Sequence, residues 1–290
     1  MTLANPLFNL TKTSPRKDST MTTQAPDYKA IKTKQNAAWS SGDYAKIGST
    51  LQITGEMLAE ATAPAHGATV LDVAGGNGNA TLAFARRWCA VTSTDYVPAL
   101  LEAGRIRAEA DKLEVTFQVA DAEDLPFEDG QFDISTSTFG VMFTPNQEQS
   151  AREMSRVVRA GGKIAMANWT PDSFIGHLFK TLGRHVPPPA GVQSPARWGN
   201  RDWIEAQFGP TAETIAFELK NFNFRYASPD HFIDFFRTYY GPVHKAFLAV
   251  GDAAEALETD MRATIAQFNV ATDGSMIVPS EYAEIVITKR

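Results

Sequence analysis

The sequence predicts an α/β fold with a doubly wound, mostly parallel sheet of seven strands. From residue 69 onward, short apolar runs rich in β-branched residues alternate with segments of helical period, a pattern typical of a parallel sheet with helices on both faces. The first run, residues 69–73, leads into a turn with glycine at 75, 76 and 78, and a helical segment follows at once. The order strand, tight turn, helix predicts a nucleotide-type ligand site.

The elements can be taken in chain order. Residues 1–27 are rich in Ser and Thr without an apolar period, so we expect a disordered leader, with Met21 as an alternative start. Residues 28–62 show helical patterning broken at 40–43, which predicts a helical lid of two helices with a joint. We expect strands at 69–73, 90–94, 114–119, 132–137, 163–168, 213–224 and 281–288. Helices are expected at 79–88, 98–112 and 146–158, with Gly161 and Gly162 between the last of them and the fifth strand.

The pattern changes after residue 168. Residues 169–247 hold 16 of the 30 aromatic residues, four of the five histidines, and three consecutive prolines at 187–189 that stiffen a connection. We therefore expect a substrate cap of helices and loops inserted late in the chain, interrupted by one strand. Residues 248–290 should supply a closing helix and strand. The whole of 28–290 is predicted to be one domain, with its ligand-binding core at 69–168.

Composition limits the class of protein. The net charge of −6 provides no basic field for a phosphate backbone, so nucleic acid is not an expected partner. The single cysteine, Cys89, cannot form an internal disulfide and has no neighbours at zinc spacing, so no metal site is predicted and a reducing cytoplasm fits. No apolar run has the length of a membrane span, and no signal peptide is present. We expect a cytoplasmic protein that binds a small molecule, with a homodimer as a possible assembly.

A glycine-rich turn alone does not identify the ligand, because enzymes that use NAD, FAD or S-adenosylmethionine (SAM) share it. The dinucleotide fingerprint read from Gly76 and Gly78 requires Gly or Ala at the position of Thr81. Asp72, inside the strand before the turn, would repel a pyrophosphate and suits a ligand that carries an ammonium group. These residues favour SAM. An NAD-type oxidoreductase and a non-catalytic SAM-binding protein remain the alternatives.

Acidic residues follow the next two strands, where ligands bind in a doubly wound sheet. Asp95 ends the second strand and could accept hydrogen bonds from both ribose hydroxyls. Asp121 follows the third strand and could accept the adenine amino group, while the next backbone N–H, that of Ala122, meets a ring nitrogen. Residues 137–143 follow the fourth strand and could form the floor of the site under the methionine end of SAM.

Residues 36–168 resemble the UbiE-like, type 11 group of class I SAM-dependent methyltransferases, which have a Rossmann-like fold. The resemblance rests on residues 70–78, 121–127, 132–134 and 156–162, with Ala74 and Ala160 where the group usually has Gly and Pro. It implies SAM as cofactor, S-adenosylhomocysteine as product, and contacts at Asp72, Gly75, Gly76, Gly78, Asp95, Asp121 and Ala122. The predicted cofactor site is completed by Ala74, Asn77, Thr138 and Tyr96, whose ring could stack on adenine.

These motifs report only the cofactor. Because aromatic residues crowd the late region, we expect a small, apolar or aromatic acceptor, methylated by in-line displacement without obligatory proton transfer. Trp39 and Tyr44 lie where relatives place an N-terminal lid, and Phe143 and Phe235 are candidate substrate walls. No catalytic residue is identified. If the acceptor must lose a proton, His231 and His177 are the candidate bases.

Overall fold

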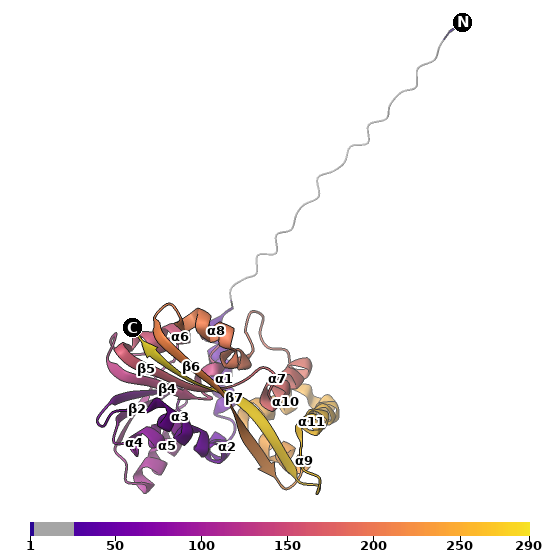
Figure 1. Cartoon of the computed structure of the whole chain (residues 1–290). Helices are drawn as coiled ribbons and strands as arrows, with labels where there is room; N and C mark the ends of the chain where they lie inside the picture. The colour runs from indigo at the N-terminus through magenta and orange to yellow at the C-terminus, as the bar shows by residue number, and fades with distance from the viewer. Residues whose placement is uncertain (3–25) are drawn as a thin grey trace.

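The computed structural model describes residues 1–2 and 26–290. The leader predicted at 1–27 therefore falls almost entirely outside the described residues. In the rest of the chain, helices surround a central sheet (Figure 1). Among the described residues, no helix combines the length and apolar character needed to cross a membrane.

Seven strands form one sheet in the order β3-β2-β1-β4-β5-β7-β6. Every neighbouring pair is parallel except the two that involve β7. The predicted fold class is thus confirmed. The strands are β1 Thr69–Val73, β2 Ala90–Asp95, β3 Val115–Val119, β4 Phe132–Thr138, β5 Val158–Trp169, β6 Ala212–Tyr226 and β7 Met276–Lys289.

The helices are α1 Tyr28–Trp39, α2 Tyr44–Thr50, α3 Gln52–Thr62, α4 Asn79–Ala85, α5 Pro98–Ala110, α6 Gln147–Arg156, α7 Phe174–His185, α8 Arg201–Phe208, α9 Pro229–Tyr239, α10 Gly241–Val250 and α11 Ala254–Phe268. Short 3-10 turns are η1 Val141–Phe143, η2 Pro195–Gly199 and η3 Gly251–Ala253. The N-terminal region has three helices where two were predicted. The extra break falls at Leu51, whose backbone leaves helical geometry (ψ 6°) while its side chain is buried.

The expected place of Gly161 and Gly162 was wrong. They lie inside β5, which begins at Val158, and not in a turn before it. The pairing of β5 with β4 shifts at this point, and a Cβ on Gly162 would come within 2.6 Å of the Asp133 carbonyl oxygen. Glycine therefore permits the two strands to approach at an irregularity in the ladder.

The late region forms a second layer of structure around a long antiparallel ribbon. β6 and β7 run side by side across the molecule, and α7, α9, α10 and α11 gather at one end of them (Figure 1). Aromatic side chains fill the space between, with Phe174, Phe224 and Phe232 in mutual edge contact. The aromatic richness of this region therefore builds a hydrophobic core.

Candidate active site

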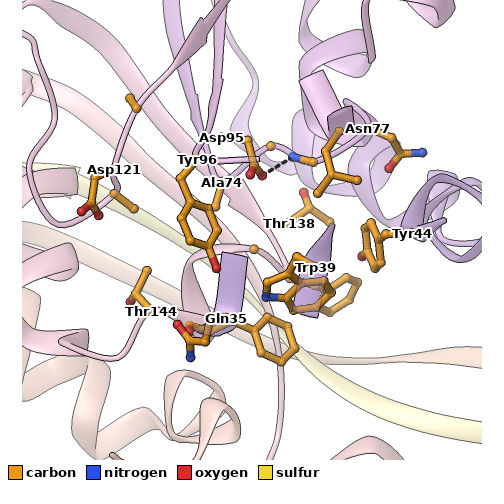
Figure 2. Close-up of a pocket in the computed structure, with 18 of the residues that line it drawn as sticks. Gln35, Trp39, Tyr44, Ala74, Asn77, Asp95, Tyr96, Asp121, Thr138 and Thr144 are labelled. Atoms are coloured by element: carbon orange, nitrogen blue, oxygen red, sulfur yellow. Dashed lines mark hydrogen bonds between the residues drawn. The ribbon is translucent and has the colours of Figure 1, made fainter. Parts of the chain in front are cut away.

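A cleft opens at the carboxyl ends of β1 to β4, with about 800 Å³ of free space including the part open to solvent. Figure 2 shows its walls. Twelve of the predicted site residues line it: Trp39, Tyr44, Ala74, Gly75, Gly76, Asn77, Asp95, Tyr96, Asp121, Ala122, Thr138 and Phe143. Phe139 and Gly140, from the stretch 137–143 expected at the methionine end, also line it. The lining residues that were not predicted are Lys32, Gln35, Asn79, Leu100, Ala120, Thr144 and Pro145. The topology thus brings loops from four strands and the N-terminal helices to one place.

The glycine turn after β1 is shaped by left-handed backbone. Ala74 and Gly76 have φ of 52° and 58°, a region that is strained for the alanine. Gly140 faces this turn from the end of β4, and a Cβ there would come within 2.0 Å of the Ala74 carbonyl oxygen. Only glycine at 140 allows the two loops to pack this closely, so the cleft floor is fixed by backbone contact.

Asp72 does not line the cleft, contrary to its predicted contact with the ligand. Its side chain is fully buried behind the turn, where Oδ2 accepts hydrogen bonds from the backbone N–H and the hydroxyl of Thr81, at 2.9 and 2.6 Å. Burial raises the pKa of Asp72 to about 7. Gly78 also lies outside the cleft lining and directly precedes α4 as its N-cap, with φ of 88°. Both residues support the turn from behind, and the Asp72 bond explains why residue 81 is a threonine.

Asp95 is the carboxylate that the sheet presents to the cleft. It is 5% exposed, and one oxygen accepts the backbone N–H of Gly76 at 3.0 Å, drawn as the dashed line at Asp95 in Figure 2. The other oxygen accepts the backbone N–H of Val97 at 2.9 Å. Burial raises its pKa to about 6, although these hydrogen bonds act in the opposite direction. The first bond ties the end of β2 to the glycine turn, so the carboxylate and the turn form one rigid surface.

Helix α1 lies across the cleft and contributes Lys32, Gln35 and Trp39 to its lining. Lys32 forms an ion pair with Asp121 and another with Glu123 at 2.9 Å. Gln35 and Asn36 donate hydrogen bonds to the carbonyls of Phe143 and Tyr96, at 3.2 and 2.8 Å. Positions 32, 35, 36 and 39 share one face of a helix, so the sequence did carry a signal for this contact surface that was not used.

Aromatic side chains at the end of α1 and next to it form one wall of the cleft. Trp39 makes edge contacts with Tyr44, Phe143 and Tyr240 at centroid distances of 5.5, 5.0 and 5.6 Å. Figure 2 shows Trp39 and Tyr44 on the side of the cleft opposite Asp121. The cleft thus has one polar, acidic side and one aromatic side.

The other predicted substrate and base residues do not reach the cleft. His231 lies on the surface, where its Nδ1 accepts the backbone N–H of Ala227 at 3.2 Å. His177 packs against Phe268, and Phe235 packs against Tyr239. In the described part of the chain, every residue that lines the cleft falls within 32–145, so the predicted cap at 169–247 does not supply its wall. The assignments of these three residues were wrong because their rings belong to the core around the ribbon and to its surface.

The residues present suit SAM. Thr138 lines the cleft, and its buried hydroxyl has no hydrogen-bond partner in the described structure. The carboxylates of Asp95 and Asp121 can accept from hydroxyl and amino groups. The backbone N–H groups of Gly75, Gly76 and Gly78 already donate within the protein, to Thr94, Asp95 and Gly75 respectively, so a ligand carboxylate would use other donors of the turn at the start of α4. The lining therefore offers acceptors for the hydroxyl and amino groups of the cofactor.

Comparisons with known proteins agree with this chemistry. A family of methyltransferase domains matches residues 71–166. An uncharacterised protein of Mycobacterium tuberculosis is 36% identical over 243 residues, which cover 83% of this chain and 89% of the relative. The demethylmenaquinone methyltransferase of Clavibacter sepedonicus is 33% identical over 135 residues, 45% of this chain and 55% of that protein.

Solved structures share the fold. The YcgJ protein from Bacillus subtilis aligns with a TM-score of 0.56 at 19% identity, over 81% of this chain and 97% of that one. A second protein, from Bacillus halodurans, aligns with the same TM-score at 20% identity, over 80% and 97%. These matches leave no support for the NAD-type alternative. The chain belongs to the class I SAM-dependent methyltransferases, and SAM is its cofactor.

Proposed function

We propose that this enzyme methylates a small, flat, apolar or aromatic acceptor, which binds against the aromatic side of the cleft. The observation that carries the proposal is the wall of Trp39, Tyr44 and Phe143, which faces the same space as Asp95 and Asp121. Aromatic faces and edges suit a flat ring better than a charged chain. The relative from Clavibacter sepedonicus, whose name refers to demethylmenaquinone, is in keeping with such an acceptor.

The acidic side of the cleft is assigned to the cofactor. Asp95 is proposed to accept the ribose hydroxyls, and Asp121 the adenine amino group, with Tyr96 against the adenine ring. Lys32 now holds the Asp121 carboxylate, so this lysine must share or release it when the amino group binds. Thr138 and the glycine turn are proposed to hold the methionine end.

Methyl transfer asks for alignment more than for acid or base groups. When bound, SAM supplies an electrophilic methyl on a sulfonium. The chain's own contribution is to hold an acceptor in line with that methyl and to exclude water by means of α1. The acceptor must share one cleft with SAM, which favours a small acceptor.

The described lining contains no histidine. Burial raises the pKa of Tyr44 and Tyr96 above the ordinary tyrosine value, so neither is a useful base near neutral pH. We therefore expect an acceptor that ionises by itself, such as an acidic phenol or a quinol, or one that needs no deprotonation.

The test is a turnover screen with methyl-labelled SAM across phenols, quinols, amines, thiols and carboxylates, with S-adenosylhomocysteine binding measured by calorimetry. We expect turnover with one or more flat phenols or quinols, and a rate that follows the pKa of the acceptor. Exclusive turnover of aliphatic amines or carboxylates would refute the acceptor class. Cofactor binding without turnover of any acceptor would instead favour the non-catalytic alternative.

A further inference from the structure

The strand β6 forms a free edge of the sheet. It pairs with β7 from Ala212 to Tyr226 and stands last in the strand order, so in the described chain no strand lies on its other side. The backbone N–H of Thr170 donates to the carbonyl of Glu281, which shows that odd-numbered residues of β7 face β5 and even-numbered ones face β6. By the β6–β7 register, the odd-numbered residues of β6 point their backbone groups away from the sheet.

This edge is long and little protected. Of its outward backbone groups in the described structure, one is occupied: the Phe217 carbonyl accepts from Arg201 of α8 at 3.0 Å. Proteins usually guard such edges with short strands, proline, bulges or charged side chains. β6 does carry four charged residues, but they have both signs, so they repel a second copy in some registers and attract it in another. β6 contains no proline, its one irregularity lies at its start, and Leu219 in its middle is 57% exposed. The edge therefore has the features of a surface that pairs with another strand.

The charges on β6 indicate which strand would pair with this edge. Leu219 lies midway between Glu218 and Lys220, and also midway between Glu213 and Arg225. These four are the charged residues of the strand. Acidic residues therefore precede the centre and basic residues follow it at matching distances, so the strand is complementary to an inverted copy of itself.

We propose that two copies of this chain associate edge to edge through β6, antiparallel, with Leu219 on the twofold axis. In such an isologous contact each residue faces the one equally far beyond the axis. Glu213 then faces Arg225 of the second copy, and Glu218 faces Lys220, which gives opposite charges at every charged position. Cross-strand pairs of this kind stabilise a sheet, whereas like charges directly opposite destabilise it.

Other registers lack this match. An axis at residue 218 places two glutamates opposite each other, and an axis at residue 220 places two lysines opposite each other. An axis at 217 or 221 aligns no opposite charges. The charge pattern therefore selects one register.

Existing contacts leave room for the second copy. Lys220 already contacts Glu284 and lies 3.8 Å from Glu218, but its ammonium has three donors. The Phe217 carbonyl has two lone pairs, so it can accept from Arg201 and from a strand. Because the described cleft lining lies within 32–145, the dimer goes beyond the proposed function and leaves both clefts outside the contact.

Sedimentation velocity on the full chain over a range of concentrations tests the contact. We expect a dimer that Leu219→Lys converts to monomer, whereas Leu248→Lys, at an exposed leucine on α10, leaves it intact. Glu213→Arg should weaken association about tenfold, because it replaces two attractive pairs by repulsive ones, and the double variant Glu213→Arg/Arg225→Glu should restore it. A monomeric parent, or a dimer unaffected by Leu219→Lys, overturns the proposal, including the case in which the edge serves a peptide of another protein.

Cross-linking tests the register. Leu219→Cys places two thiols opposite each other at a backbone spacing of about 5.5 Å, which a disulfide can bridge. Asn221→Cys places them about 14 Å apart along the strands, so it should not cross-link. The native Cys89 is buried and does not interfere. Oxidation should give a covalent dimer only for Leu219→Cys, and a covalent dimer from Asn221→Cys would overturn the register.

Discussion

The two ends of the sheet differ in how much of their use can be read from short motifs. On the side of β1 to β4, each parallel strand ends in a loop at the same edge, and those loops form the cleft. On the side of β6 and β7, a long antiparallel ribbon is held by aromatic packing and supplies no cleft residue in the described structure. Parallel strands concentrate chemistry because their carboxyl ends coincide, whereas an antiparallel ribbon alternates direction and does not.

The largest effect is expected when the carboxylate of Asp95, at the end of a parallel strand, is removed. Asp95→Ala should weaken S-adenosylhomocysteine binding by about 1.5 to 3 kcal/mol, the usual loss for hydrogen bonds to a charged group. Calorimetry measures the affinity, and circular dichroism checks the fold. Glu213→Ala on the ribbon is the matched control and should leave the affinity unchanged. Equal affinities for Asp95→Ala and the parent would remove the ribose assignment.

A pH titration sharpens the same assignment. The pKa of Asp95 is raised to about 6, so the ionised acceptor is present above that pH and is lost as pH falls. We expect S-adenosylhomocysteine affinity to drop about tenfold, about 1.4 kcal/mol, for each pH unit below 6.

The free energy of unfolding of the free enzyme should respond to pH in the opposite sense, because it should fall as pH rises. A carboxyl group whose pKa is raised on folding stabilises the protein below its unfolded pKa of about 3.9 and loses that contribution as pH rises through its folded pKa. For Asp95 the loss runs from about pH 4 to 6. Asp95→Asn should flatten the affinity profile and make the fall in stability over this window shallower, while buried Asp72, whose pKa is raised to about 7, keeps a slope from about pH 4 to 7. A profile that is unchanged in this variant would show that another group titrates.

Sequence reasoning succeeded where local chemistry decides position. Gly75, Gly76, Asp95 and Asp121 lie in the lining of the cleft because each ends or follows a parallel strand, and their contacts with the cofactor stay a prediction. Asp72 was misplaced because sequence does not tell on which side of a turn a carboxylate lies, and here Thr81 binds it from behind. Lys32 was missed because it comes from a helix that reaches the cleft only through tertiary packing.

The late region shows the converse. Its aromatic richness predicted a substrate pocket, but aromatic residues fill cores as readily as they line pockets, and composition does not separate the two. Phe174, for example, is fully buried among Phe224, Phe232 and Phe268. The aromatic residues form a core here because helices pack against the ribbon of β6 and β7, and this packing depends on contacts between residues far apart in the sequence.

A smaller effect is expected at the aromatic wall. Trp39→Leu should lower kcat/KM for the acceptor found in the screen by about 1 kcal/mol, because an aromatic contact is worth that order beyond its area. Trp88→Leu is the matched control, since Trp88 is 76% exposed and does not line the cleft. Steady-state kinetics on both variants measures the difference. If the two variants lose activity equally, the wall does not bind the acceptor.

The smallest expected effect tests the ribbon side directly. His231 does not line the described cleft. Its ring accepts one exposed hydrogen bond, from the backbone N–H of Ala227. His231→Ala should therefore change the free energy of unfolding by no more than about 0.5 kcal/mol, as exposed substitutions usually do. Acceptor selectivity and S-adenosylhomocysteine affinity should match the parent. The measurements are denaturant unfolding, calorimetry and competition between two acceptors. A change in selectivity alone would break the comparison between the two sides, because it would require the late region to reach over the cleft during turnover.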